Sequence, residues 1–461
     1  MTDGRSGSGP VLARDPARPA PPVRLVHLGL GNFFRAHQAW YTDQAPDASE
    51  WGYAAFSGTG RGNLAARLAG QQGLYTLITR SADTDLFAVV RSLAATHSIE
   101  DHQAWLGYFS SAELSAVTVT VTEAGYLRGA DGALDLDRDG VQADLATLRR
   151  DPRAVVRTAP GRLVAGLLAR RRADAGPLAL IPCDNLPGNG TVLGRVVRDF
   201  AGRVDPTLPV WLDASVSVVT TAVDRITPST TAADVEAVRL STGVRDACPV
   251  VTEPFQEWVL SGSFPNGRPA WDAAGATFTD DVTPFEHRKL WLLNGGHSLL
   301  AYAGLLRGHE TVAQAVSDEL CQAWLQQWWD LAATRLPQPA AELGRYRAAL
   351  LERFANPRIQ HRLAQIAADG SQKLPIRVLP VLRLERAEGG LPQPALRILA
   401  AWIGALRSHQ LTDVRAAEVR ARAAGGLPDA VPRLLEVLAP ELAADAELVA
   451  AVVTAAGELG R

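Results

Sequence analysis

Lysine is almost absent from this chain. The sequence has 461 residues and 46 basic residues, but only Lys289 and Lys373 are lysines, so the other 44 are arginines. An ammonium group can act as a base when its surroundings lower its pKa, whereas a guanidinium stays protonated. The two lysines are therefore candidates for a chemical role. The alternative is that the composition has shifted from lysine to arginine and that these two lysines remain without a special role.

Cysteine is also scarce. Cys183, Cys248 and Cys321 are odd in number and scattered, with no paired spacing that would hold zinc. We therefore expect a cytoplasmic protein without disulfides and without a structural metal ion.

Long apolar runs and an excess of charge are missing too. No uninterrupted apolar run reaches about 18 residues, so no segment is expected to span a membrane. Residues 1–22 are rich in Gly, Pro, Ser and Arg, which predicts a disordered tail rather than a signal peptide. The net charge of −3 and the pI near 6.3 do not indicate a nucleic-acid or membrane partner. We expect a monomer or small homo-oligomer whose partner is a small molecule.

The remaining sequence predicts two domains. Apolar or alternating runs predict strands at 23–28, 51–56, 86–91, 116–122, 178–182 and around 210–223, with helical segments such as 162–172 and 191–201 between them. This alternation favours an α/β domain with an open, mostly parallel sheet over residues 23–281. Nearly every later segment has helical spacing, which predicts a mostly α-helical domain over residues 282–461.

A glycine-rich turn follows the first strand. The run Gly29–Ala36 (GLGNFFRA) ends a strand and begins a helix, which is the context that a dinucleotide-binding turn requires. The glycines permit close approach of the backbone, and the helix N-terminus would face a pyrophosphate. Phe34 occupies the place of the usual third glycine, whereas Asn32 and Arg35 lie within reach of a phosphate. A plain structural turn is the alternative.

The end of the second strand usually decides between NAD and NADP, because an acidic side chain there holds the ribose hydroxyls. This chain has the run 57–62 (SGTGRG) at that place, without a carboxylate. Arg61 is a candidate for binding a 2′-phosphate, and a solvated surface arginine is the alternative. The cofactor is therefore expected to be NAD or NADP, with the choice open.

The segment 281–297 contains the first lysine. The run 283–286 (TPFE) supplies an N-cap, a proline at the first helical position and the partner of a capping box, so a helix is expected from Pro284. At about 100° per residue, Glu286, Lys289, Asn294 and His297 share one side of this helix. Apolar residues fill much of the remaining surface, so the polar side must face a polar site.

These four side chains suit the oxidation of an alcohol. A desolvated Lys289 near the Glu286 carboxylate could be neutral near physiological pH and remove a hydroxyl proton. Asn294 can hydrogen-bond the resulting alkoxide, and His297 can orient the same oxygen. The alternative is a buried lysine–glutamate pair with a structural role.

Further polar residues follow strands or lie in a predicted loop. Asn185 lies three residues after the strand at 178–182, at the carboxyl end of the sheet, where ligands of open α/β folds bind. Asp224 ends another strand. Lys373 lies in the run 369–375 (DGSQKLP), which is predicted as a loop in which an ammonium group can hold hydroxyl or carboxylate oxygens.

Together these runs resemble the mannitol dehydrogenase family of polyol-specific long-chain dehydrogenases, typified by mannitol 2-dehydrogenase and fructuronate reductase (D-mannonate oxidoreductase). The similarity extends from about Leu25 to Trp402. It includes, in order, VHLGLGNFFRAHQAWYTD, TVTEAGY, CDNLPGNG, VDRITP, EPFQEWVLSGSFPNGRPAWDAAGATFTDDVTPFE, KLWLLNGGHSLLAYAGLL and DGSQKLP. The resemblance implies a Rossmann-type NAD(P)-binding domain and a helical substrate domain of the 6-phosphogluconate dehydrogenase type. It also implies a metal-independent oxidoreductase.

The resemblance assigns roles to individual residues. Lys289 matches the general base, Asn185 and Asn294 the groups that hydrogen-bond the reacting oxygen, and His297 a group that helps to place it. Glu286 matches a glutamate linked to proton exchange with solvent. The substrate positions are Asp224 and Lys373, and the cofactor turn comprises Gly29, Gly31, Asn32, Phe33, Phe34 and Arg35.

Two departures from the mannitol dehydrogenases bear on specificity. Those enzymes carry an arginine eight residues before the second lysine, where this chain has Gln365, and the run 365–377, ending at Arg377, looks more like the fructuronate reductase branch. A sugar acid, D-mannonate or D-fructuronate, is therefore the expected substrate, with Gln365 and Arg377 as further binding candidates. A polyol such as D-mannitol is the alternative, and a non-catalytic nucleotide-sensing protein is the alternative of another class. The acidic pair that the family carries after the second strand aligns with Gly60 and Arg61, which leaves strict NAD use open.

Overall fold

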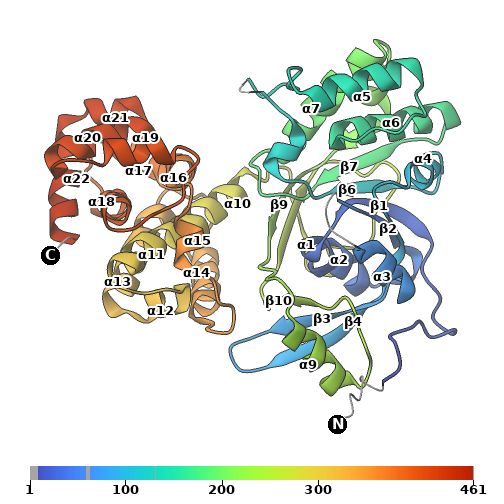
Figure 1. The fold of residues 1–461 in the computed structure, drawn as a ribbon, viewed down its shortest axis with the longest axis horizontal. Coiled ribbons are helices and arrows are strands. Elements are labelled where there is room, and N and C mark those ends of the chain that lie inside the picture. The colour runs from blue at the N-terminus through green and yellow to red at the C-terminus, as the bar shows by residue number, and fades with distance from the viewer. Residues whose placement is uncertain (1–8, 59–62, 130, 460–461) are drawn as a thin grey trace, which may run out of the picture. The chain divides into compact units, whose positions relative to one another are not determined.

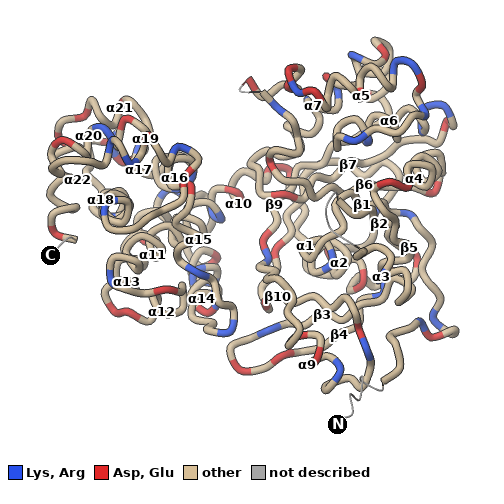
Figure 2. The backbone as a smooth tube through the Cα atoms, viewed as in Figure 1, with Lys and Arg blue, Asp and Glu red and all other residues tan. Residues whose placement is uncertain are grey.

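The computed structural model describes residues 9–58, 63–129 and 131–459 (Figure 1). It divides the chain into two compact units, Met1–Thr283 and Pro284–Arg461, so the predicted domain boundary lies two residues from this division. Basic and acidic residues are interspersed along the backbone of both units, in keeping with the near-neutral net charge (Figure 2).

A six-stranded parallel sheet forms the centre of the N-terminal unit. Its order is β5 (Leu93–His97), β2 (Gly52–Ser57), β1 (Val23–Leu30), β6 (Ala116–Val119), β7 (Leu178–Pro182) and β8 (Val216–Val218). This is the strand order of a doubly wound dinucleotide-binding sheet, which reverses between β1 and β6. The predicted fold class, a Rossmann-type domain followed by a mostly helical domain, is therefore confirmed.

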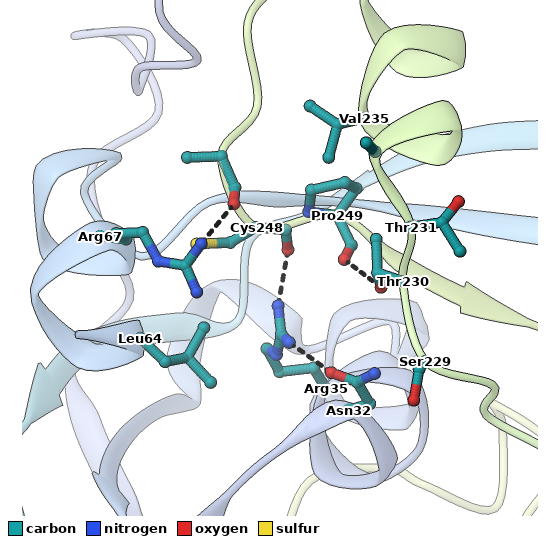
Figure 3. A pocket seen from close by; sticks show the side chains of 12 residues that line it. Asn32, Arg35, Leu64, Arg67, Ser229, Thr230, Thr231, Val235, Cys248 and Pro249 are labelled. Atoms are coloured by element: carbon teal, nitrogen blue, oxygen red, sulfur yellow. Dashed lines mark hydrogen bonds between the residues drawn. The ribbon is translucent and has the colours of Figure 1, made fainter. Parts of the chain in front are cut away.

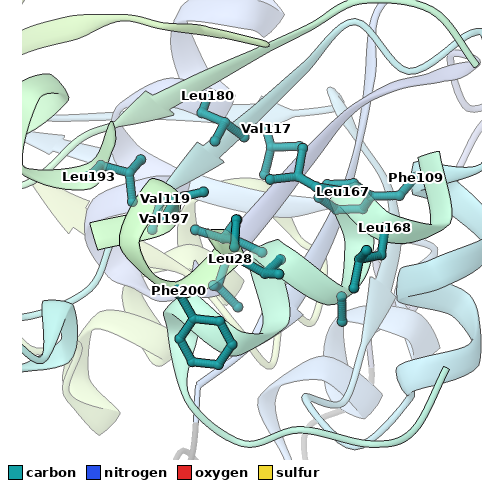
Figure 4. Close-up of a cluster of buried hydrophobic side chains, with 14 of the residues drawn as sticks. Leu28, Phe109, Val117, Val119, Leu167, Leu168, Leu180, Leu193, Val197 and Phe200 are labelled. Carbon is teal, nitrogen blue, oxygen red and sulfur yellow. The ribbon is translucent and has the colours of Figure 1, made fainter. Parts of the chain in front are cut away.

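Helices α6 (Ala159–Ala173) and α7 (Asn189–Val204) cover one face of this sheet. The buried side chains of Val117 and Leu180 on the strands pack with Leu167, Val197 and Phe200 of the two helices (Figure 4). Because the strands are covered, their residues read as nearly continuous apolar runs. Each such buried side chain stabilises the fold by about 1.5–3 kcal/mol.

Two three-stranded sheets complete the strand structure of this unit. One has the order β10 (Val250–Thr252), β3 (Tyr75–Arg80), β4 (Asp85–Val90), and the other has the order β12 (Thr277–Phe278), β11 (Glu257–Ser261), β9 (Thr220–Asp224).

The prediction of strand around 210–223 is wrong in its first part, where α8 (Leu208–Ser215) forms. A proline in its first turn suits a helix, and Leu208 and Leu212 bury one side of it. The other helices of the unit are α1 (Asn32–Ala36), α2 (Gln38–Gln44), α3 (Leu64–Gly70), α4 (His102–Phe109), α5 (Asp139–Arg150) and α9 (Ala232–Thr242).

Residues 9–22 differ from the predicted disordered tail. Leu12 is buried, and its amide donates to the carbonyl oxygen of Arg245 at 3.0 Å. The Arg14 guanidinium donates to the carbonyl oxygens of Gln72, Arg91 and Leu93. These contacts hold the segment against the domain, and its composition gave no sign of them. Residues 1–8 lie outside the described residues.

The C-terminal unit is built from helices around α11 (Gly295–Leu306), nearly all of whose residues are buried. Packed against it are α12 (Val312–Ser317), α13 (Glu319–Ala333), α15 (Leu363–Ala367), α16 (Gly370–Arg377) and α18 (Gln393–Ser408). None of the described helices is long and apolar enough to cross a membrane. The remaining helices are α10 (Thr283–Arg288), α14 (Ala340–Ala355), α17 (Leu379–Ala387), α19 (Ala416–Arg422), α20 (Leu427–Leu438), α21 (Pro440–Ala444) and α22 (Ala446–Leu459).

Candidate functional site

The glycine turn lies at the carboxyl end of β1, beside the point where the strand order reverses. Gly29 has φ +115°, and a Cβ atom there would lie 2.2 Å from the carbonyl oxygen of Thr120, so only glycine fits. Gly31 is extended and directly precedes α1. The turn therefore brings the backbone of β1 close to the residue after β6 and directs the first amide groups of α1 toward the carboxyl edge of the sheet.

Arg35 holds this turn together. Its guanidinium is buried and donates to the carbonyl oxygens of Gly31 (3.2 Å) and Cys248 (2.6 Å) and to Oδ1 of Asn32 (2.7 Å). Asn32 in turn donates from Nδ2 to the carbonyl oxygen of Pro228 at 3.3 Å. Arg35 was predicted to lie within reach of a phosphate, and the structure shows that most of its donors are used within the protein.

The two phenylalanines of the turn have different surroundings. Phe34 is fully buried and stacks on His27 at 3.7 Å between ring centroids, so its assignment to the cofactor site is corrected to a core position. Burial lowers the pKa of His27 to about 3, so the ring is neutral at ordinary pH. Phe33 is partly exposed and stacks on His37. The helix predicted through Tyr41 is interrupted at His37, where α1 ends and α2 begins.

A pocket of about 480 Å³ adjoins the turn (Figure 3). Its walls come from α1, α3, the segment 229–235 and the segment 247–249, and they include Asn32, Arg35 and Arg67. Its lining contains two arginines and three hydroxyl side chains but no carboxylate, so its chemistry suits an anionic ligand. Arg61, the predicted 2′-phosphate ligand, lies outside the described residues.

The loop after β7 carries Asn185 at an exposed position. The neighbouring Asp184 accepts a hydrogen bond from the hydroxyl of Tyr126 and another from the Leu186 amide at 2.9 Å. Burial raises the pKa of the Asp184 carboxyl above its usual range. The loop that presents Asn185 is thus fixed on the side of the TVTEAGY run, which contains Tyr126.

Asn189 fixes the same loop from the other side. It is fully buried, and its Nδ2 donates to the carbonyl oxygens of Pro182 and Asp184 and to Oγ1 of Thr221. Its Oδ1 accepts from the Thr221 amide at 2.9 Å. Asn189 therefore joins the Asn185 loop to β9, the strand that ends at the buried Asp224. The prediction missed Asn189, although it is one of only seven asparagines in the chain.

Lys289 begins a π-helical segment, Lys289–Asn294, between α10 and α11. Indole Nε1 of Trp328 donates to the carbonyl oxygen of Trp291 at 2.8 Å, and that of Trp329 donates to Leu292 at 2.8 Å. Wide turns of this kind leave carbonyl groups out of register with the helix ladder and occur often at functional sites. The two tryptophans of α13 therefore stabilise the turn in which Lys289 lies.

The π segment changes the predicted helix geometry. Spacing of about 100° per residue does not hold across a π turn, so the angles predicted for Asn294 and His297 do not apply. Glu286 lies on α10, before the segment. Within the described residues, the side chain of Asn294 makes no hydrogen bond, so its amide is free to bind a ligand.

The second lysine lies on a helix and not in the predicted loop. Lys373 and Arg377 are one turn apart on α16, which packs on the π segment. Asp369, directly before α16, has φ +56°, so the glycine-containing run turns sharply into a helix instead of continuing as a loop. Lys373 Nζ donates to the carbonyl oxygen of Ile366 at 3.2 Å. Burial, with the Arg377 charge as the next cause, lowers the pKa of Lys373.

His297 lies close to the same cationic groups. It is buried on α11, its ring lies 5.0 Å from that of His361, and its Nε2 has no hydrogen-bond partner among the described residues. Burial, followed by the charges of His361, Arg353 and Arg377, lowers the pKa of His297 well below its usual range. His297 is therefore neutral, with a ring nitrogen left for a ligand. Gln365 lies on α15, exposed.

The predicted residues thus fall into two groups. Asn185 and Asp224 lie in the N-terminal unit on segments that Asn189 joins, whereas Lys289, Asn294, His297 and Lys373 lie in the C-terminal unit on elements that pack together. Among the described residues, no cluster of three or more His, Cys, Asp or Glu side chains is arranged to hold a metal ion.

Comparison with known proteins gives matches to both units. The family model for the mannitol dehydrogenase Rossmann domain matches residues 23–273, and that for the mannitol dehydrogenase C-terminal domain matches residues 281–459. The chain is 37% identical to D-mannonate oxidoreductase of Escherichia coli over 82% of this chain and 79% of that protein. It is 35% identical to mannitol 2-dehydrogenase of Cereibacter sphaeroides over 82% of this chain and 80% of that protein. A solved structure of Pseudomonas fluorescens mannitol 2-dehydrogenase with NAD and D-mannitol is similar with a TM-score of 0.80 and 33% identity, covering 98% of this chain and 94% of that one.

Proposed function

Because the chain belongs to the mannitol dehydrogenase family and is therefore an oxidoreductase acting on CH–OH groups, we propose that it interconverts D-mannonate and D-fructuronate with NAD or NADP. The observation that carries the proposal is the position of Lys289. One of only two lysines in 461 residues begins a π turn that also contains the free amide of Asn294.

The chemistry assigns one step to each group. Lys289 removes the proton of the substrate hydroxyl, because a lysine is the one cation here that can act as a base. Asn185 and Asn294 donate hydrogen bonds to the oxygen as it gains negative charge, and the neutral His297 places it. Glu286 passes the proton to solvent. A nicotinamide dinucleotide bound at the glycine turn would supply the hydride acceptor, and the proposed mechanism uses no metal ion.

The N-terminal unit suits the cofactor. Gly29 permits the backbone approach that a pyrophosphate requires, and the adjoining pocket offers guanidinium and hydroxyl groups without a carboxylate. Gly31, Asn32 and Phe33 would bind the dinucleotide around this turn.

The cationic groups on α16 favour a sugar acid over a polyol. Lys373 and Arg377 lie one turn apart, and Arg377 donates to Oγ of Ser298, the residue after His297. The Nε of Arg377 is buried without a partner among the described residues. A carboxylate would satisfy these donors, whereas the hydroxyls of a polyol would not compensate their charge. Asp224 and Gln365 would hydrogen-bond the hydroxyl groups of the substrate.

The similarity to mannitol 2-dehydrogenases favours a second candidate, oxidation of D-mannitol to D-fructose. Assays of the purified protein with D-fructuronate, D-mannonate, D-fructose and D-mannitol, each with both cofactors, separate the two. Turnover of the acids at a kcat/KM at least tenfold above that of the polyols supports the proposal, and the reverse preference rejects it. Absence of turnover with every pair would favour a nucleotide-sensing protein.

The lysine base has its own test. Lys289→Ala is expected to lower kcat by about 10²–10⁴-fold, the contribution of general-base catalysis, while the dissociation constant of the cofactor changes less than twofold. Lys289→Arg should be equally inactive, because arginine stays protonated. Arg345→Ala, at an exposed position of α14, is the matched control. Normal turnover by Lys289→Arg would contradict the proposal. In the wild type, oxidation should rise with pH through a single ionisation that Lys289→Ala lacks.

A further inference from the structure

The lining of the pocket beside the glycine turn is cationic. Arg35 on α1 and Arg67 on α3 both line it, and its lining contains no Asp or Glu (Figure 3). Burial is the main cause that lowers the pKa of Arg35; the charge of Asp246 raises it, and the charge of Arg67 lowers it, so the two guanidinium groups act on each other. Two like charges on the wall of one pocket favour an anionic ligand.

The carboxylate of Asp246, whose charge acts on Arg35, forms its hydrogen bonds with other groups. Asp246 is buried, and its oxygens accept hydrogen bonds from the side chain of Gln71 and from the amides of Thr76 and Cys248. Neither Arg35 nor Arg67 forms an ion pair within the part of the chain that the structure describes. The guanidinium group of Arg67 is therefore available to a ligand.

Arg67 is the arginine that can bind a ligand directly. Its side chain is exposed, and its one hydrogen bond within the described residues runs from Nη1 to the carbonyl oxygen of Ala247 at 3.3 Å. Four of the five guanidinium donors thus remain for a ligand. Arg35 differs, because its three donor nitrogens are bound to Gly31, Cys248 and Asn32.

The elements that carry Arg35 and Arg67 indicate which part of a dinucleotide would lie nearby. Leu30, in the glycine turn, pairs with Ser57 at the end of β2, so the pyrophosphate and ribose sites of a dinucleotide are neighbours here. Arg67 lies on α3, the first helix after β2. The end of β2 is where a dinucleotide presents its adenosine ribose, and a nearby arginine accommodates a 2′-phosphate there.

We propose that Arg67 binds the 2′-phosphate of NADP and that this pocket makes the protein prefer NADP to NAD. The inference rests on the proposed dinucleotide-dependent function and adds the residue that selects the cofactor.

Nucleotide fragments test the proposal without turnover. Isothermal titration calorimetry of the full chain should give a dissociation constant for 2′,5′-ADP at least tenfold below that for 5′-AMP. In Arg67→Ala the affinity for 2′,5′-ADP should fall at least tenfold, while that for 5′-AMP changes less than twofold. Arg150→Ala, at an exposed position of α5, is the control and should change neither affinity. Far-UV circular dichroism checks that each variant is folded.

Three results would overturn the proposal. Equal affinities of the wild type for the two nucleotides would show that the 2′-phosphate is not bound. Equal weakening of both by Arg67→Ala would show a structural role of this arginine. Failure of the wild type to bind either nucleotide would remove the dinucleotide function as well, which distinguishes that failure from the first two.

Discussion

Asn189 shows how a buried polar residue can govern a site that it does not enter. Its amide binds the carbonyl oxygens on both sides of the turn after β7 and the backbone of β9, so one side chain fixes the segments that carry Asn185 and Asp224. A buried amide with all these partners is rigid, because any rotation would leave several groups unsatisfied.

Replacing Asn189 should therefore affect catalysis and stability together. In Asn189→Ala the buried amide of Thr221 loses its acceptor, which should lower the free energy of unfolding by about 1–3 kcal/mol. Displacement of Asn185 should reduce kcat by about 10- to 100-fold. Urea unfolding, steady-state kinetics and cofactor binding would measure these changes.

Measuring cofactor affinity distinguishes a loss of Asn185 positioning from general damage to the fold. It should remain within twofold of the wild type in Asn189→Ala, because the glycine turn lies on another strand. Gln103→Ala, at an exposed position of α4, is the control. An unchanged kcat in a destabilised Asn189→Ala protein would show that the residue does not position the catalytic loop.

Individual residues were predictable from sequence where their motif is local. The turn glycines and Asn185 follow strands closely, so their place at the carboxyl edge of the sheet follows from chain order. Phe34 and Asn189 were assigned wrongly or missed because burial decides their roles, and burial depends on segments distant in sequence. Phe34 lies against His27, and Asn189 lies against Thr221.

At the scale of elements, the π segment (Lys289–Asn294) determines the geometry around the proposed base. It depends on α13, whose tryptophans donate to its carbonyl oxygens, and on Gly295 and Gly296, whose missing side chains leave room for those indole rings. A Cβ atom at Gly295 would lie 2.8 Å from Nε1 of Trp328.

Removing one indole donor should relax the wide turn. Trp328→Phe keeps an aromatic ring but removes the indole donor to the buried carbonyl oxygen of Trp291, so the free energy of unfolding should fall by about 1–3 kcal/mol. Because Lys289 begins the turn, kcat should fall about tenfold or more. Chemical unfolding and steady-state kinetics provide the measurements.

Trp324→Phe is the matched control on the same helix, since its indole nitrogen makes no hydrogen bond within the described residues. It should retain kcat. If Trp328→Phe lost stability but turned over normally, the turn would not be holding the base in place.

Hydrophobic periodicity could not reveal this turn. The segment 284–306 is apolar enough to predict one continuous helix, and helices do form over all of it. The wide turn depends on acceptors and donors 37 residues apart in sequence, which no local pattern encodes. For the same reason the run around Lys373 was predicted as a loop, although α16 forms there.

For the molecule as a whole, the alternation of strands and helices was sufficient to predict the two units and the parallel sheet. Strand order was not derivable from periodicity, because it depends on which strands pair across long crossovers. Composition also missed the packing of residues 9–22, where Arg14 binds three carbonyl oxygens.

Acid should destabilise the whole protein through its buried neutral histidines. The pKa of His27 is about 3 in the folded chain and about 6.5 when unfolded, so its contribution is complete above pH 6.5 and is lost as the pH falls toward 3. For each histidine that is neutral when folded, the free energy of unfolding falls by about 1.4 kcal/mol for every pH unit by which the pH is lowered within that range. His297 acts in the same direction.

Urea unfolding between pH 7.5 and 5 measures this dependence. His27→Asn should be less stable at pH 7.5 and should show a slope smaller by about 1.4 kcal/mol per pH unit below pH 6. His409→Gln, at an exposed position, should retain the wild-type slope. Identical slopes in His27→Asn and the wild type would locate the acid sensitivity elsewhere.

The π segment also has a consequence for how this protein can evolve. A wide turn contains one residue more than the ordinary helical turn that it replaces. Deletion of one residue between Lys289 and Asn294 would restore a regular helix and leave the residues on either side facing nearly as before, because the wide turn accommodates one extra residue. The carbonyl groups that Trp328 and Trp329 bind would then return to the ordinary helix ladder. A single three-nucleotide deletion would thus remove the local geometry around the proposed base while Glu286 and His297 keep their sides of the helix.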